Sequence, residues 1–335
     1  MSAKLTFGYL YDFRNPPQFH RPWDALYSEI LDIIAWTEGA GFEGAWVPEH
    51  HLADDGYMPS PLVALAAIAA RTKRIKLGTA IALAPLYNPT RFAEDCAVLD
   101  IIAGGRLEIG LAIGYRRRET AAFGVEFTKR GRMFDEWLEI VTRLWAGETL
   151  DFNGQHYAFK GAKVMPPAPR GRIPLYIGGF ADKSVERVVR YGDGYVGSDH
   201  VCKAYVDRLR ELGRDPASAK VRITGLMTVV AHDPPAAMEE LAPYFHHVNN
   251  SYGEWFCEDQ ALGLKDGFRP MSLDQFKASG TLQIVTPDAA VAMFKELQTR
   301  MPLDHYMMML PPGLPAKRFM HYAEIFAKEV MPKFR

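Results

Sequence analysis

The chain has 335 residues, with 39 Lys and Arg against 40 Asp and Glu, so its formal net charge is −1. This balance argues against a general nucleic-acid or anionic-membrane surface, and any anionic ligand must be held by a local site. The composition, 48% hydrophobic and 24% charged, is typical of a globular protein. The length allows one large α/β domain or two smaller ones.

Cysteine usage and the absence of targeting signals indicate a cytoplasmic protein. Cys96, Cys202 and Cys257 are widely separated and form no CxxC pair, which argues against a disulfide framework or a zinc ribbon. The segment Met1–Leu10 lacks a basic stretch followed by an apolar core. The longest apolar-rich stretch, Leu62–Ala70, is too short to span a bilayer.

Short apolar or β-branched runs alternate with longer segments of helical periodicity along the whole chain. The predicted strands are Leu5–Leu10, Ala45–Pro48, Ile75–Leu83, Leu107–Gly114, Leu175–Ile177, Tyr195–Ser198, Val221–Ala231 and Tyr306–Leu310. The predicted helices are Asp24–Ala40, Pro59–Arg71, Pro89–Ile102, Arg132–Trp145, Ser184–Tyr191, Val201–Leu212, Thr286–Leu297 and Lys317–Lys328. This alternation favours an α/β fold, a single (β/α)₈ TIM-like barrel, over a doubly wound sheet, which usually has fewer strands.

Two segments interrupt the alternation. Thr149–Phe159 is predicted to form an irregular hairpin. The stretch from about Pro234 to Leu282 is predicted to be an insertion at the carboxyl-terminal face of the barrel, before the helix Thr286–Leu297. Because no linker or composition break is visible, residues 1–335 are expected to form one domain.

Glu49-His50-His51 directly follows the second predicted strand. In a barrel of this kind chemistry takes place where strands end. Successive side chains of an extended chain point to opposite faces, so both histidines can hardly bind one metal, and no H-x-H or H-E-x-x-H motif occurs. We therefore expect no metal site. Two interpretations remain open: a polar rim with ordinary hydrogen bonds, or a single inward-facing histidine that donates or accepts a proton.

Glycine-rich turns follow two later strands. Gly110 and Gly114 precede Tyr115-Arg116-Arg117-Arg118-Glu119, an arginine run that is either a solvated loop or a source of charge for a phosphate. Gly178-Gly179 lies between a strand and a helix, where backbone N–H groups bind anions, although glycines also serve tight turns alone. With Arg132 near another helix start, these features indicate a phosphate-bearing cofactor.

Other polar residues receive little functional weight. His246, His247 and Cys257 lie in the predicted insertion, and adjacent residues of a helix do not face the same way. The small residues Gly78–Ile81 at a strand end either pack closely inside the barrel or form a flat wall for a planar ring.

An ordered set of motifs resembles the bacterial luciferase-like family of flavin-dependent oxidoreductases, and the resemblance covers nearly the whole chain. It is strongest from Gly41 to Trp145. The motifs that carry it are Gly41-Phe42, Trp46-Val47, Glu49-His50-His51, Arg71–Thr79, Asn88-Pro89-Thr90-Arg91, Ala93-Glu94-Asp95, Leu99-Asp100, Gly104–Leu107 and Phe123-Gly124.

The resemblance implies a TIM-like barrel that uses reduced FMN, in some members a deazaflavin, at the carboxyl-terminal mouth. It implies that His50, in the motif begun by Glu49, lies near the flavin and assists proton transfer. Ala80 and Ile81 fall where relatives often have a non-proline cis peptide bond beneath the flavin ring. The backbone of Gly178, Gly179, Phe180 and Ala181 would bind the FMN phosphate. Ile113 aligns with a phosphate-binding arginine of luciferase, so Arg116, Arg118 or Arg132 would replace that arginine here.

The resemblance therefore predicts a flavin-dependent monooxygenase. Reduced FMN, supplied by a separate reductase or by diffusion, would react with O₂ to give a C4a-peroxyflavin that oxygenates a small apolar substrate. Substrate selectivity is expected in the insertion and in the loops Tyr11–Trp23 and Asp54–Pro59. A homodimer is expected from the resemblance alone. The alternatives are a deazaflavin-dependent hydride-transfer enzyme, a non-catalytic flavin-binding protein and, more distantly, a metal-dependent hydrolase.

Overall fold

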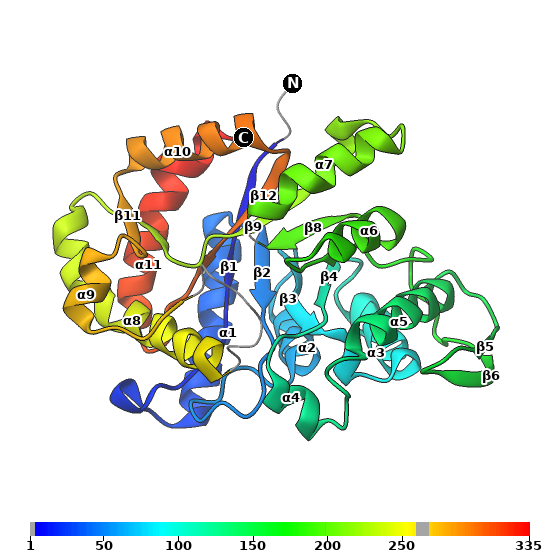
Figure 1. The fold of residues 1–335 in the computed structure, drawn as a ribbon. Helices are drawn as coiled ribbons and strands as arrows, with labels where there is room; N and C mark the ends of the chain where they lie inside the picture. Colours follow the sequence, from blue (N-terminus) through cyan, green and yellow to red (C-terminus); the bar gives the residue numbers. More distant parts are fainter. Residues whose placement is uncertain (1–3, 198, 259–267) are drawn as a thin grey trace.

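Eight parallel strands close into a barrel in the computed structural model, which describes residues 4–197, 199–258 and 268–335 (Figure 1). Around the barrel the strands follow the order β1-β12-β9-β8-β7-β4-β3-β2, and each neighbouring pair is parallel. Their bounds are β1 Thr6–Leu10, β2 Gly44–Val47, β3 Lys76–Leu83, β4 Leu107–Ala112, β7 Leu175–Ile177, β8 Gly194–Gly197, β9 Val221–Thr224 and β12 Leu303–Met309. The predicted TIM-like barrel is confirmed.

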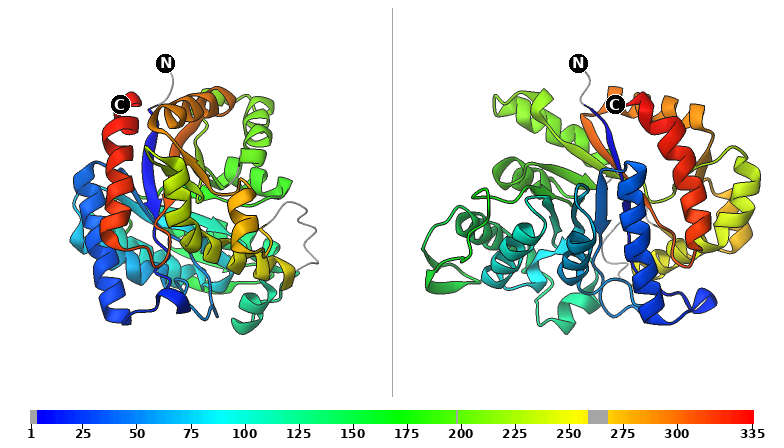
Figure 2. Two further views of the ribbon diagram at one scale, coloured as in Figure 1. Left: turned by 90° about the vertical axis from the view of Figure 1, so that its left-hand side faces the viewer. Right: turned by 180° about the vertical axis from the view of Figure 1, so that it is seen from behind.

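Helices cover the outside of the barrel (Figure 2). Their bounds are α1 Trp23–Ala40, α2 Pro61–Arg71, α3 Pro89–Ile102, α4 Arg117–Ala122, α5 Arg130–Trp145, α6 Asp182–Tyr191, α7 Cys202–Glu211, α8 Pro234–Glu258, α9 Leu273–Ala278, α10 Pro287–Arg300 and α11 Ala316–Ile325. The chain closes on itself because α11 packs beside α1.

Local signals explain why several helix starts agree with the prediction. The Asn88 side chain accepts the N–H groups of Thr90 and Arg91, and Pro89 occupies the first position of α3. Thr286 caps α10 in the same way. At the carboxyl end of the chain, α11 is shorter than predicted, because a π-helical turn, Phe326–Val330, replaces its last residues. Ser198, the predicted end of a strand, lies outside the described residues.

The predicted strand Val221–Ala231 is wrong, because the structure divides it into two strands. Only β9 belongs to the barrel, and the chain leaves the barrel at Gly225. At Gly225 the backbone passes so close to the Tyr306 ring that a Cβ would overlap it. The continuation, β10 (Thr228–Val230), pairs in parallel with β11 (Gln283–Val285) outside the barrel.

The remaining elements lie outside the barrel. The strands β5 (Leu150–Asn153) and β6 (Ala158–Ala162) form the predicted hairpin, with antiparallel pairing. In the segment predicted to be an insertion, α8 and α9 pack on each other, and α8 also contacts β11; residues 259–267 of this segment lie outside the described residues. Within the described part of the chain, no helix has the combined length and apolarity that a membrane crossing requires.

Charged and aromatic side chains fill the amino-terminal end of the barrel. Arg222 lies 2.6 Å from a Glu108 carboxylate oxygen and stacks 3.4 Å above the Tyr176 ring. Burial and the nearby Arg222 charge lower the pKa of His305, so His305 is neutral and accepts the indole N–H of Trp46 at 2.8 Å. A hollow of about 500 Å³ opens beside these side chains, on the face opposite the strands' carboxyl ends. We call the side chains of Trp46, Glu108, Tyr176, Arg222 and His305 the barrel floor.

Candidate active site

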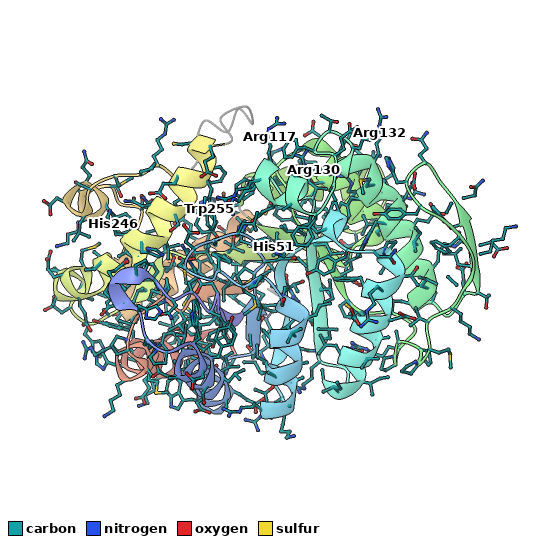
Figure 3. All side chains as sticks on the ribbon, turned by 90° about the horizontal axis from the view of Figure 1, so that it is seen from below. His51, Arg117, Arg130, Arg132, His246 and Trp255 are labelled. Atoms are coloured by element: carbon teal, nitrogen blue, oxygen red, sulfur yellow. The ribbon has the colours of Figure 1, made fainter. Side chains whose placement is uncertain are left out.

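The predicted motif Glu49-His50-His51 lies at the carboxyl ends of the barrel strands, directly after β2. Figure 3 views the molecule from this side, with His51 near the middle of the picture and Trp255 of α8 beside it. All three side chains of the motif are buried, His50 being 7% exposed. The site is therefore an enclosed one, formed by strand ends and by α8.

Glu119 of α4 holds this motif in place. Its Oε1 atom lies 2.9 Å from Nδ1 of His50, accepts the backbone N–H of His51 at 2.9 Å, and accepts Nη1 of Arg116 at 3.0 Å. Burial alone raises the pKa of Glu119, but the hydrogen bonds from His50 and His51 and the Arg116 charge together bring it below its usual value. Glu119 is therefore ionised.

An ionised carboxylate only accepts hydrogen bonds. Nδ1 of His50 therefore carries a hydrogen and donates a hydrogen bond to Glu119. Among the described residues none forms a hydrogen bond with Nε2 of His50. The imidazole is thus fixed by one nitrogen, and its other nitrogen has no hydrogen-bond partner among the described residues. This arrangement orients a histidine for proton exchange.

Glu49 has different partners. One carboxylate oxygen lies 2.8 Å from Nε2 of His51 and accepts the Tyr87 hydroxyl at 2.8 Å, and the other accepts the backbone N–H of Leu83 at 2.7 Å. The side chain is 2% exposed, and the Leu83 contact ties it to the end of β3. Glu49 therefore positions its neighbours. His50 and His51 bind different carboxylates, as expected for successive residues of an extended chain.

Four aromatic rings surround the imidazole of His50. The ring centroids of Tyr57 and Trp255 both lie 4.8 Å from it, and those of Tyr115 and Tyr252 lie 5.7 and 5.8 Å away. The guanidinium of Arg116 lies 4.2 Å from the Trp255 ring. We call these four rings the aromatic wall. It excludes water from the vicinity of His50.

Ala80 and Ile81 lie on β3, and the peptide bond between them is cis. The Ile81 side chain packs against the turn after β7, since a Cβ on Gly178 would lie 2.5 Å from its Cδ1 atom. The structure thus brings together two sequence features that were expected to bind the flavin ring and its phosphate.

The Gly178–Ala181 turn leads directly into α6. Gly179 has a φ of 143°, and a Cβ there would overlap the Ser184 hydroxyl, so both the conformation and the space require glycine. Phe180 is 57% exposed, and at the N-cap residue Ala181 the side chain forms no capping hydrogen bond. The Ser184 N–H donates to the Ala181 carbonyl at 2.8 Å, which leaves the N–H groups of Asp182 and Lys183 for an anion, although the Asp182 carboxylate opposes one.

The arginines expected at a phosphate lie in two different places. Arg116 is 1% exposed and lies beside His50, paired with Glu119. Arg132 is exposed in the first turn of α5 and lies on the same rim as Arg130 in Figure 3. Arg187 of α6 donates to the Gly131 carbonyl at 2.8 Å, so the start of α5 lies against α6. Arg132 is thus on the helix next to the Gly178–Ala181 turn.

Several residues of this site escaped the sequence analysis. Glu119 was visible only as the end of an arginine run, and the helix α4 that presents it was not predicted. His247 received little weight, yet its Nε2 atom lies 2.6 Å from a carboxylate oxygen of Asp55. For the rings that surround His50, the sequence signal was the aromatic content of the segments around Tyr57 and Trp255. Within residues 4–197, 199–258 and 268–335, no group of three or more His, Cys, Asp or Glu side chains is arranged to hold a metal ion.

Known proteins resemble this chain in sequence. It is 24% identical over 335 residues to the oxygenase component of flavin-dependent trigonelline monooxygenase from Acinetobacter baylyi, covering 92% of this chain and 90% of that protein. It is 26% identical over 323 residues to the F420-dependent glucose-6-phosphate dehydrogenase of Mycolicibacterium fortuitum, covering 92% and 94%. Several other curated relatives are matched over only about half of their length.

The fold has a counterpart in the crystal structure of the monooxygenase RslO1 from Streptomyces bottropensis. The TM-score is 0.84 at 21% identity, and the match covers 99% of this chain and 100% of that one. A family model described as luciferase-like monooxygenase matches residues 5–303. The chain therefore belongs to the luciferase-like monooxygenase family.

Proposed function

We propose that the protein is a flavin-dependent monooxygenase that uses reduced FMN and O₂ to oxidise a small organic substrate. The observation that carries this proposal is the buried His50, fixed at Nδ1 by the ionised Glu119 and enclosed by the aromatic wall. Support also comes from the trigonelline monooxygenase, which is named as flavin-dependent and as an oxygenase component.

The residues at the strand ends fit a flavin mononucleotide. Gly178 and Gly179 leave no space for a Cβ, and the N–H groups of Asp182 and Lys183 at the start of α6 would bind a phosphate, with Arg132 on the neighbouring helix as its cation. Ala80 and Ile81 would support the ring system. When bound, reduced FMN supplies the electrons and the site of oxygen activation, which no side chain supplies.

The side chains have three tasks in this proposal. Nε2 of His50 exchanges a proton with the reacting groups, while Glu119 keeps the imidazole oriented and stabilises its positive charge. Arg116 balances the buried Glu119 carboxylate. The aromatic wall, with Trp255 and Tyr252 contributed by α8, shields the reaction from water.

The leading alternative is a deazaflavin-dependent hydride transfer on the same barrel. The specific observation in its favour is the similarity to the F420-dependent glucose-6-phosphate dehydrogenases. In that reaction His50 would still exchange a proton, but O₂ would take no part. A separate reductase as the source of reduced flavin, and a homodimer, remain part of our proposal. A non-catalytic flavin-binding protein would retain the site and give no product.

Anaerobic titration of the purified protein with oxidised FMN, reduced FMN and a reduced deazaflavin separates these proposals. We expect reduced FMN to bind most tightly. We also expect admission of O₂ to give an absorbance transient absent from free reduced FMN. Tight binding of the deazaflavin alone, with no response to O₂, would replace the monooxygenase proposal by the hydride-transfer one. Rapid oxidation of NADH without an added reductase would contradict the two-component arrangement.

A further inference from the structure

A second buried polar cluster lies beside the aromatic wall. The Arg14 guanidinium donates through Nε to Asp55 at 2.7 Å and through Nη2 to Ser251 at 2.6 Å, and the same Nη2 lies 3.1 Å from Nε2 of His247. Arg14 follows β1, Asp55 follows β2, and the other two residues belong to α8. We call these four residues the Arg14 cluster. It joins two barrel loops to the helix that covers the site.

The contacts between Arg14 and its neighbours use only some of the N–H groups of the guanidinium. Its Nε and Nη2 atoms are used, but Nη1 has no hydrogen-bond partner among the described residues, although the side chain is fully buried. Asp12 is similar: its Oδ1 atom accepts the backbone N–H of Arg14 at 3.2 Å, while Oδ2 is buried without a described partner. A buried polar atom left without a partner is costly, so each such atom requires an explanation.

The Arg14 guanidinium contacts two of the rings that surround His50. The Arg14 guanidinium is 4.9 Å from the centroid of the Tyr57 ring and 5.7 Å from that of Trp255. These are the two rings whose centroids lie 4.8 Å from the imidazole of His50. Tyr57 and Trp255 therefore contact both Arg14 and His50, and Trp255 belongs to α8 (Figure 3).

The partners of the cluster limit the kind of group that Nη1 can bind. Asp55 is held ionised, because the His247 hydrogen bond and the Arg14 charge outweigh the rise in pKa that burial causes. The Arg14 charge is thus already balanced by Asp55, so Nη1 needs an oxygen acceptor, which can be neutral or charged. Carbonyl and carboxylate oxygens are the usual acceptors of a guanidinium N–H.

We propose that Arg14 is the substrate-recognition residue of this site. Its Nη1 atom binds a carbonyl or carboxylate oxygen carried by a planar ring, and Tyr57, Tyr252 and Trp255 contact that ring. The proposal rests on the proposed function in one respect: it takes His50 as the residue beside the reacting groups. It adds a substrate class: ring compounds with an oxygen acceptor, in place of purely apolar molecules.

Three probes with the same ring test this recognition directly: benzoate, acetophenone and toluene. Their dissociation constants are measured by ligand-observed NMR on the full-length protein, with and without saturating oxidised FMN. A hydrogen bond to a charged group predicts that benzoate or acetophenone binds about 10- to 100-fold more tightly than toluene. A preference for benzoate identifies the carboxylate, and a preference for acetophenone identifies the carbonyl. Equal binding of all three probes, or no binding of any, overturns the proposal.

The variant Arg14→Lys keeps the positive charge beside Asp55 but removes Nη1. We expect it to reduce the preference over toluene to about threefold or less, because a point charge lacks the guanidinium's directed donors. The matched control is Arg91→Lys, at an exposed arginine of α3, which should keep the wild-type preference. An unchanged preference in a folded Arg14→Lys protein contradicts the proposal, and if this variant does not fold, the wild-type probe series decides by itself.

The proposed function is tested separately by FMN binding. If FMN binds and the probes show no preference, only the recognition proposal fails. If the probes show the preference and no flavin binds, only the flavin proposal fails.

Discussion

Replacing Glu119 by Gln is the most informative change at this site. The variant keeps the size of the side chain but removes the negative charge of the carboxylate, whose Oε1 atom accepts hydrogen bonds from His50, His51 and Arg116. Arg116 then remains buried without its counter-ion, since both side chains are 1% exposed and its next carboxylate, on the half-exposed Glu258, is 3.8 Å away. Breaking a buried pair in this way costs about 3–5 kcal/mol of unfolding free energy.

The same change impairs the proposed proton transfer, because an amide does not stabilise a protonated His50 as a carboxylate does. We expect product per reduced flavin to fall by about 10²-fold or more, as for His50→Ala. Urea unfolding and product yield are measured together, with Glu126→Gln as the control, since Glu126 is an exposed acid of the neighbouring loop. A loss of about 1 kcal/mol or less, the range of an exposed pair, would refute the reasoning about burial. Wild-type yield would refute the role of Glu119.

Three further predictions concern other parts of the structure. Arg222→Met leaves the buried Glu108 of the barrel floor with only the more exposed Lys76 amine, 3.7 Å away, so urea unfolding should show a loss of about 3–5 kcal/mol, while the double change to Met at positions 222 and 108 should recover most of it. Burial, against the Arg14 charge, raises the pKa of Asp12 from 3.8 to about 7, and a raised pKa makes the folded state bind more protons than the unfolded one. Wild type should therefore lose stability relative to Asp12→Asn as the pH rises across that interval, and a constant difference would contradict the shift. Gly179→Ala should weaken FMN binding about tenfold or more, because its φ of 143° disfavours a side chain, whereas Gly39→Ala, where a Cβ meets nothing within 4 Å, should not.

Short-range signals explain why the barrel was predictable. The strands are short buried runs, and Asn88 and Pro89 mark the beginning of α3 in the sequence itself. The end of the seventh strand was not predictable, because it depends on contact between Gly225 and Tyr306, which are far apart in the chain. Only folding reveals such a contact.

The candidate site divides in the same way. The place of Glu49-His50-His51 at the end of a barrel strand was predictable, because the motif follows a short apolar run. The contacts of Glu119 and His247 were not predictable, because their partners are distant in the chain. Glu119 contacts His50, 69 residues away, and His247 contacts Asp55, 192 residues away. A charged residue within a charged run, or a histidine on a helix, carries no local sign of such a partner.

The helix α8 packs on elements outside the barrel and also contributes residues to the candidate site. It packs on α9 and on β11, outside the barrel, yet Ser251, Tyr252 and Trp255 reach the buried site. His50 and Glu119, in contrast, are fixed by the barrel strands and the loops that follow them. Under the proposed function, α8 supplies only part of the surroundings of the substrate, since Arg14 and Tyr57 come from barrel loops. Substitutions at Tyr252 and Trp255 would therefore change the wall beside His50 while leaving in place the Glu119 carboxylate that orients it.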